Sequence, residues 1–365
     1  MKRRFIGIDL HKKSFTMAIK DEDGKIVVST MELLPANIEK LKTMLKKTDY
    51  VAVEVSGSTF YFYDQIKDCV EKCVVVNPKK FKVVCESTNK TDKKDAKLLA
   101  KYLSYEDLLP EVYVPNQNIR KLRSYFSLYN LTKKQVNQTK NRIGSLLLYN
   151  GINLEPDFLY AKNNRNAVLN IDLDNDYKEI IKKLYEKLDY LEKEKEFITY
   201  KMFKHGKQNY KKEIDILTSI SGISVLIALA LISDIADIKR FLNAKKLCSY
   251  LGVVPKVDSS GETTKIGSLQ RDSRKISRSL LTQVITHLHN NSEHLTSFYY
   301  RKKSKGAGKA RIALMRKTIT MIYHMLSKNE YSYYRDEKKQ VRKIREFEIE
   351  LKKGEKEFKL IKKTA

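Results

Sequence analysis

The first fifteen residues limit the fold of this chain more than any other stretch, because they set an acid into an apolar strand. An apolar run over residues 5–8 ends at Asp9, a basic turn follows at 11–13, and apolar strands resume at 15–19 and 26–28. This spacing predicts a β-hairpin or meander. A buried acid costs several kcal/mol unless it binds a cation. Asp9 is therefore either a metal ligand or a strand-end residue that caps the next turn.

The following residues alternate between helical and strand patterns. A helix is expected over 33–47, a strand over 50–55 with the single acid Glu54, a helix over 60–69 and a strand over 73–77. Strand, helix and strand in this rhythm predict an α/β domain. A further helix begins near Thr91, whose hydroxyl can cap it.

Asp92 and Asp95 lie one helical turn apart at the start of that last helix. Each has a plain structural interpretation, since an acid in a first turn complements the helix dipole and Asp95 can pair with Lys94 or Lys97. Together with Asp9 and Glu54 they form a set of four acids. Such a set can hold Mg²⁺, or Mn²⁺, which prefers oxygen ligands, and metal ions of this kind serve phosphodiester chemistry.

The charge of the chain points to a polyanionic partner. Lys and Arg total 72 against 44 Asp and Glu among 365 residues, which gives a formal net charge of +28. Nucleic acid is the partner that such an excess favours, and binding should depend steeply on salt. No apolar run approaches the length of a membrane span and no signal peptide is visible, so a cytoplasmic, nucleoid-associated protein without membrane contact is expected.

Four motifs in this part of the chain carry a resemblance to a known family. They read FIGIDLHKK, VEVSG, VVVNPKKF and KTDKKDAKLLA, in this order along the sequence. The segment resembles the N-terminal RuvC-like domain of the DEDD transposases of the insertion-sequence one-ten family. The resemblance implies that Asp9, Glu54, Asp92 and Asp95 form a metal site. TDxxDA is the most specific motif, whereas GID alone also occurs in actin-like kinases.

The middle of the chain predicts long helices. A basic helical pattern covers 119–149, and a second helix over 177–200 carries apolar residues at alternating spacings of four and three, at Tyr177, Ile181, Leu184, Leu188, Leu191 and Ile198. This seam fits a coiled coil or an internal hairpin of the two helices, and the two interpretations can coexist. The resemblance supports a coiled-coil insert.

A helix-turn-helix pattern begins the C-terminal part. Residues 216–223 lead through a Ser-Gly-Ile turn into the apolar helix 225–232. This pattern resembles a helix-hairpin-helix, which offers backbone N–H groups to a phosphate, although a plain helix turn explains it equally simply.

A Ser-Gly pair follows on a basic loop. Composition alone gives this pair little weight, because Ser-Gly loops are common and a Ser hydroxyl needs activation to act as a nucleophile. However, LGVVP followed by SG resembles the C-terminal domain of the same family, where the Ser before Gly is the nucleophile. By position this is Ser260, with Ser259 as the neighbour that could replace it.

The segment after this loop departs from the family pattern. The Gly expected before the Leu-rich helix is replaced by Asp272 or Ser273, which leaves the local register open, while Arg278 and the Leu pair remain. Candidate nucleic-acid contacts are the basic residues of these loops and turns: Lys12, Lys13, Lys79, Lys80, Lys256, Lys265, Arg271, Arg274 and Arg278.

The predicted fold is an α/β RuvC/RNase H-like domain followed by long coiled-coil helices and a mainly α C-terminal domain with a helix-hairpin-helix-like segment. The expected domains are a catalytic domain at 1–114, a coiled-coil insert at 115–212, a C-terminal transposase domain at 213–330 and a charged helical tail at 331–365. This tail, residues 331–365, is expected to be either a solvated helix or an RNA-binding extension.

The predicted function is a DNA transposase or recombinase with a seryl-phosphate intermediate assisted by Mg²⁺. The resemblance further implies guidance by a structured non-coding RNA, and we expect a homo-oligomer, dimer or tetramer, acting on donor and target DNA. Two alternatives remain. One is a hydrolytic RuvC-type nuclease or junction resolvase in which Ser260 is structural, and the other is a non-catalytic nucleic-acid-binding protein.

Overall fold

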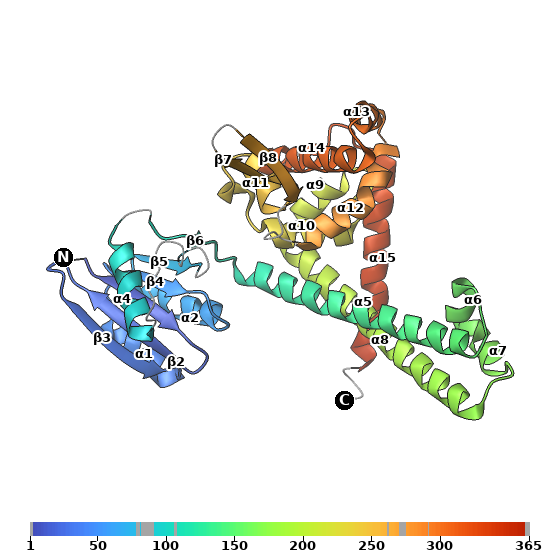
Figure 1. The fold of residues 1–365 in the computed structure, drawn as a ribbon, viewed down its shortest axis with the longest axis horizontal. Coiled ribbons are helices and arrows are strands. Elements are labelled where there is room, and N and C mark those ends of the chain that lie inside the picture. The colour runs from blue at the N-terminus through green and yellow to red at the C-terminus, as the bar shows by residue number, and fades with distance from the viewer. Residues whose placement is uncertain are drawn as a thin grey trace. The chain divides into compact units, whose positions relative to one another are not determined.

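The computed structural model describes residues 3–77, 81, 91–105, 108–260, 263–269, 275–290 and 292–361. The chain divides into two compact units, Met1–Val114 and Pro115–Ala365, each with its own core. Each unit is described by itself below, with the elements labelled as in Figure 1.

A mixed sheet forms the centre of the first unit. Within the described residues six strands pair in the order β3-β2-β1-β4-β5-β6 (Figure 1). β1 pairs antiparallel with β2, β2 antiparallel with β3, and β1 and β5 each pair parallel with β4, as in an RNase H-like domain. The strands are β1 (Phe5–Leu10), β2 (Ser14–Lys20), β3 (Ile26–Glu32), β4 (Tyr50–Glu54), β5 (Lys72–Val76) and β6 (Glu111–Val112). The predicted meander and the α/β class are confirmed.

Helices cover both faces of this sheet. α1 (Pro35–Met44) and α2 (Thr59–Ile66) bury Leu41 and Phe62 against Ile6 and Ile8 of β1. α4 (Asp92–Leu103) packs on the opposite face, where its Ala96 and Ala100 form a cluster with Ala18 of β2. Because side chains alternate along a strand, the odd-numbered residues of β1 face α4.

The second unit is built almost entirely from helices. Its long helices are α5 (Gln117–Tyr149), α8 (Asn175–Asn209), α14 (Ala307–Lys328) and α15 (Glu337–Ile361). Its shorter helices are α6 (Pro156–Tyr160), α7 (Arg165–Leu169), α9 (Lys211–Thr218), α10 (Val225–Ile235), α11 (Ala244–Tyr250), α12 (Lys275–Asn290) and α13 (Glu293–Lys303). None of the helices within the described residues has a stretch long and apolar enough to span a membrane.

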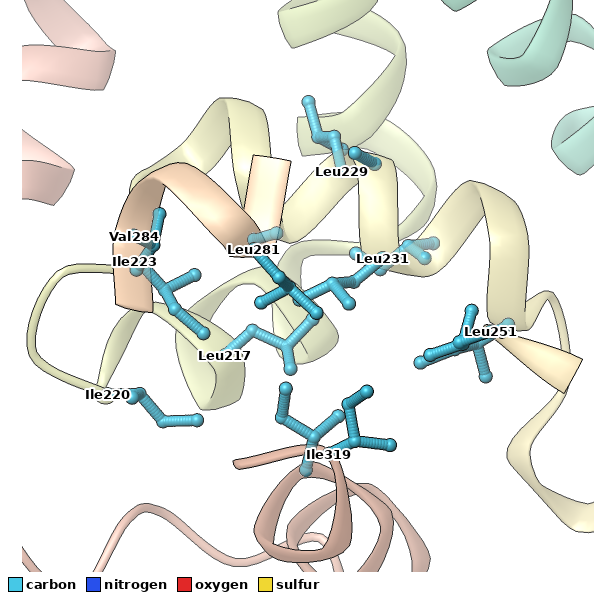
Figure 2. Close-up of a cluster of buried hydrophobic side chains, with 14 of the residues drawn as sticks. Leu217, Ile220, Ile223, Leu229, Leu231, Leu251, Leu281, Val284 and Ile319 are labelled. Atoms are coloured by element: carbon cyan, nitrogen blue, oxygen red, sulfur yellow. The ribbon is translucent and has the colours of Figure 1, made fainter. Parts of the chain in front are cut away.

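The core of this unit lies where α9, α10, α12 and α14 meet. Figure 2 shows Leu217, Leu231, Leu281 and Ile319 pointing toward one another from these four helices, and each is fully buried. Burial of such aliphatic side chains contributes about 1.5–3 kcal/mol each. α10 is apolar on every side, which fits its central place.

α9 and α10 form the predicted helix-turn-helix. The turn between them uses Gly222 at φ +87°, a conformation that a residue with a Cβ rarely adopts. Ser224 caps α10 by accepting a hydrogen bond of 3.4 Å from the Ile227 N–H. The segment is therefore two helices joined by a tight turn whose residues Ser221 and Gly222 are half-buried, and binding of a phosphate by this turn stays a prediction.

The apolar seam of α8 packs inside the chain. Ile181, Leu188 and Leu191 are buried in one cluster with Ile143 and Leu147 of α5. The two helices lie side by side over this region (Figure 1), and α6 and α7 close its end. The seam is thus an internal hairpin surface, and coiled-coil association between chains stays a prediction.

The charged C-terminal helix is docked, which corrects the expectation of a helix surrounded by solvent. Phe347 and Leu351 of α15 are buried, and Phe347 packs edge-on against Phe203 of α8 with ring centres 5.2 Å apart. Lys343 donates hydrogen bonds of 2.9 Å to the carbonyl oxygens of Thr218 and Ile220. The apolar residues missed in this charge-rich stretch recur at helical spacing, so the helix covers the core with one face.

The Ser-containing loop of the sequence is a β-hairpin, which corrects the prediction of a loop. β7 (Pro255–Ser260) pairs antiparallel with β8 (Thr263–Leu269), and Ser260 is the partner of Thr263. The Thr-Thr-Lys-Ile run explains this, since β-branched residues favour strands even in a polar sequence. Gly261 and Glu262, between the two strands, lie outside the described residues.

Candidate metal and catalytic site

Gly7 of β1 brings the acidic helix α4 against the sheet. A Cβ built on Gly7 would lie 2.1 Å from the Ala96 carbonyl oxygen and 2.5 Å from the Ala100 nitrogen. Only a glycine therefore allows α4 to approach β1 this closely. The first turn of α4, with Asp92 and Asp95, starts four residues before Ala96 and is carried to the same strand.

Strand register places Asp9 and Glu54 at neighbouring positions. β1 and β4 run parallel, and Ile8 pairs with Val53, so the next residues along the two strands are Asp9 and Glu54. Ile8 and Val53 belong to the core on the face that α1 and α2 cover. Because side chains alternate along a strand, Asp9 and Glu54 lie on the opposite face, which α4 covers. The acids predicted from sequence thus come from adjacent strand ends and from the helix that covers them.

His11 joins two of these acids directly. Its Nε2 lies 3.2 Å from an Asp9 carboxylate oxygen and 3.3 Å from an Asp92 carboxylate oxygen. Asp9 is only 6% exposed, while His11 and Asp92 are exposed. Ligand atoms of the three residues all lie within 4.8 Å of one another, a grouping that could hold a metal ion.

The electrostatics of Asp9 reflect both burial and crowding. Burial raises the pKa of the Asp9 carboxyl, the charges of Asp92 and Asp95 raise it further, and His11 opposes them. Burial acts to lower the pKa of His11, but Asp9 and Asp92 together raise it above its usual value. The cluster thus holds an excess of negative charge that a cation relieves.

The cap of α4 holds its first turn in place. Thr91 accepts a hydrogen bond of 3.3 Å from the Lys94 N–H, which confirms the cap predicted from the sequence. Asp92 is then the first helical residue, where a negative charge also complements the helix dipole. The structural and the metal-binding interpretations of Asp92 are therefore compatible.

The donor set fits a divalent cation. Carboxylate oxygens are the ligands that Mg²⁺ and Mn²⁺ prefer. Of the four predicted acids, the structure brings Asp9 and Asp92 together with His11, while Glu54 and Asp95 are not part of this group. His11 adds a nitrogen donor that the sequence interpretation had treated only as part of a basic turn. Its signal was the D-x-H spacing, which sets an imidazole just past the buried acid.

The predicted nucleic-acid contacts meet different outcomes. Lys12 and Lys13 are exposed in the turn between β1 and β2. Lys79, Lys80, Arg271 and Arg274 lie outside the described residues, and Lys256 and Lys265 occupy positions in β7 and β8. Arg278 of α12 donates a hydrogen bond of 3.2 Å to the Gly252 carbonyl oxygen, so it helps to fix the segment that leads into β7.

Ser277 ties the first turn of α12 to α10. Its N–H and its hydroxyl both donate to one Asp234 carboxylate oxygen, at 3.0 and 2.7 Å. Asp234 and Ser277 are fully buried. The last turn of α10 thus holds the first turn of α12 in place. Asp272 and Ser273, which stand where the family pattern has a glycine, lie outside the described residues.

These features define a class of protein before any comparison. A mixed sheet in the order β3-β2-β1-β4-β5-β6, with acids at adjacent strand ends and on the helix that covers them, is consistent with an RNase H-like domain, and a helical unit follows it in the chain.

Comparison with known proteins narrows the class to a family. Residues 6–149 match the family model of DEDD transposases of the IS110 type, and residues 214–300 match the model described as transposases of the IS116/IS110/IS902 family. The chain belongs to the IS110 family of insertion-sequence transposases, which are enzymes of DNA recombination.

Two relatives illustrate how far this similarity extends. The transposase for insertion sequence element IS1111A of Coxiella burnetii (strain RSA 493 / Nine Mile phase I) is 20% identical over 337 residues, which are 90% of each chain. The transposase for insertion sequence element IS1533 of Leptospira borgpetersenii is 23% identical over 262 residues, 67% of this chain and 73% of the relative.

Proposed function

We propose that the protein cuts and rejoins DNA strands through a phosphoseryl intermediate on Ser260, with a divalent cation held by Asp9, Glu54, Asp92 and Asp95. The observation that carries the proposal is the group of Asp9, His11 and Asp92, with Glu54 at the neighbouring strand position and Asp95 in the same first turn of α4 as Asp92. The two family matches cover the acids and the Ser-Gly hairpin, which supports a role for both in one reaction.

In this mechanism Ser260 forms a bond to phosphorus as the bond to a deoxyribose oxygen breaks. The hydroxyl proton is lost as the serine attacks, and the leaving oxygen takes up a proton. The seryl ester keeps the phosphodiester energy, so a second hydroxyl can reverse the reaction and rejoin strands without ATP. A bound divalent cation would supply charge stabilisation at the phosphate.

The residues of the acid site hold and balance charge. Asp9, buried with a raised pKa, contributes the desolvated carboxylate that a cation compensates. His11 lies between the Asp9 and Asp92 carboxylates, which raise the pKa of its imidazole, and the protonated ring offsets their repulsion. Basic residues near the hairpin would orient the phosphate.

Charge-neutral substitutions test the acid site. Asp9→Asn and Glu54→Gln should abolish strand transfer, by about a hundredfold or more, and lose Mn²⁺ binding measured by isothermal titration, while nucleic-acid binding persists. Asp23→Asn, an exposed acid in the turn between β2 and β3, is the matched control. Full activity of Asp9→Asn, or strand transfer undiminished by EDTA, would remove the metal role.

Guidance by a structured RNA belongs to the same proposal. It is supported by the family membership and by the +28 charge, which exceeds what a short DNA site needs. Sequencing the nucleic acid that copurifies with the protein tests it. A single RNA from the flank of the coding element is expected, and a mixture of abundant cellular RNAs would argue against guidance.

A further inference from the structure

A basic groove, called the α13–α14 groove below, lies between α13 and α14. None of its lining residues is among those predicted from the sequence to bind nucleic acid. It has a volume of about 460 Å³ and is lined by Phe298, Lys302, Lys305, Lys309, Ala313, Arg316, Lys317 and Thr320. The two helices pack against each other. Five of the eight lining residues are cationic and none is acidic.

The lining residues follow helical spacing on both elements. Phe298, Lys302 and Lys305 are four and three residues apart along α13 and its end. On α14 the lining positions are 309, 313, 316, 317 and 320, which fall on one face. Two helical faces therefore direct their cations into one groove, and neighbours such as Lys303 and Arg311 lie outside it.

These cations differ in their partners from several basic residues on and around α15. On and around α15, Lys204, Lys207, Arg335 and Arg342 each pair with a glutamate. Within the part of the chain that the structure describes, none of the five cavity cations forms an ion pair with a carboxylate. Five like charges gathered without counter-charges repel one another, and a bound polyanion relieves that cost.

Lys317 is held in a fixed place at the base of this groove. Its Nζ lies 4.6 Å from the centre of the Phe298 ring and donates a hydrogen bond of 2.6 Å to His294 Nε2. His294 in turn stacks on Tyr334 with ring centres 5.4 Å apart. An ammonium group held by an aromatic ring and an imidazole loses little freedom when it binds a phosphate.

The N-terminus of α14 adds to the positive electrostatic potential of the groove. The helix begins at Ala307 after Gly306, whose φ of +105° turns the chain sharply between the two helices. The unpaired N–H groups of a helix N-terminus attract anions. Lys305 and Lys309 flank this start, so the mouth of the groove is positive from both backbone and side chains.

We propose that this α13–α14 groove binds the phosphodiester backbone of a nucleic acid. An apolar or peptide ligand fits less well, because the one aromatic ring of the groove is covered by Lys317 and, at 6.0 Å, Lys302. This inference concerns binding and not strand transfer. If the groove does not bind nucleic acid, the proposed reaction of Ser260 is unaffected. The phosphodiester belongs either to the DNA substrate or to an RNA.

A charge-matched pair of variants of the full-length protein tests the groove. Lys302→Gln with Arg316→Gln removes two exposed groove cations, while Lys303→Gln with Arg311→Gln removes two cations from the same helices outside it. Fluorescence anisotropy with a duplex DNA and with an RNA hairpin, over a series of salt concentrations, gives Kd and the salt slope for each protein.

The groove variant should bind nucleic acid about tenfold more weakly than the control variant. The slope of log K, where K is the association constant, against log salt should become less steep by about 1.4–1.8, as expected for two lost phosphate contacts. Weaker binding of the duplex DNA alone would identify the ligand of the groove as DNA, and weaker binding of the RNA hairpin alone would identify it as RNA. Either result supports the proposal. Equal losses in groove and control variants, or no loss in both, would overturn it. Lys305→Gln with Lys309→Gln repeats the test at the mouth.

Discussion

Gly7 sets how closely α4 approaches the sheet, and that distance brings Asp92 to Asp9. The contact is between backbone atoms on both sides, since a Cβ would meet the Ala96 carbonyl and the Ala100 nitrogen. Backbone cannot rotate away as a long side chain can. One missing side chain in β1 thus controls the geometry of acids on a different element.

Gly7→Ala should therefore separate α4 from β1. We expect a loss of about 1–3 kcal/mol in the stability of the first unit, or more, together with loss of Mn²⁺ binding. Gly57→Ala is the control, because nothing lies within 4 Å of a Cβ at that position. Thermal unfolding and isothermal titration measure the two effects, and a stable Gly7→Ala protein that binds metal normally would contradict this account of the site.

Lys343 gives the second unit a pH dependence. Burial lowers the pKa of its ammonium group to about 8, from 10.5. A depressed pKa means that the stability from this group is fully present above about pH 10.5 and is lost as the pH falls through 8. The free energy of unfolding of the wild type, relative to Lys343→Met, should therefore rise from pH 8 to 10.5.

Thermal unfolding of the wild type and of Lys343→Met across this pH range measures the difference. Tyrosines that titrate in the same pH range affect both proteins equally and cancel. Lys356→Met, at an exposed position of α15, should show no such pH-dependent difference. A difference between the wild type and Lys343→Met that stays constant with pH would mean that the ammonium group is solvated in the folded protein.

The α5–α8 hairpin depends on its internal seam. Leu188 is fully buried between the two helices, so Leu188→Asp should melt the end of the hairpin at a cost of about 3 kcal/mol or more. Tyr190→Asp, at a site 67% exposed on the same helix, is the control. Circular dichroism and light scattering separate the outcomes: a lower oligomeric state with unchanged helix content would show that Leu188 serves contacts between chains instead.

Elements with strong periodicity were predictable from the sequence. The meander, the helix over the seam and the acid-bearing strands follow from alternation and spacing within short windows. The β7–β8 hairpin was missed because its strands are polar, and the docking of α15 was missed because charge dominates its composition. Both depend on partners that are remote in sequence.

The sequence predicts the four acids as a set, and their shared role stays a prediction, but the contacts between elements that bring Asp92 to Asp9 were not predictable. Sequence spacing placed Asp92 and Asp95 on one helix face, yet the contact of α4 with β1 depends on Gly7, which spacing alone does not reveal. A glycine inside a strand is a general signal for close backbone approach. Likewise the role of His11 between Asp9 and Asp92 arises only when two elements meet.

The charge of the chain is organised differently along its length. Glutamates of α15 pair with Lys204 and Lys207 of α8 and with Arg342 of α15 itself, whereas the α13–α14 groove gathers cations without such pairs among the described residues. A net charge of +28 therefore does not mean a uniform basic surface. Binding of nucleic acid is expected to concentrate where the cations are unpaired.

The covalent role of Ser260 is the central claim, and trapping a protein–DNA adduct tests it most directly. Wild-type protein with Mg²⁺ and a nicked DNA substrate should give a denaturant-resistant adduct, and mass spectrometry should map it to the peptide that contains Ser260. Ser259→Ala should keep the adduct and Ser260→Ala should lose it. An adduct that persists in Ser260→Ala, or strand transfer by the wild type with no adduct, would contradict the account.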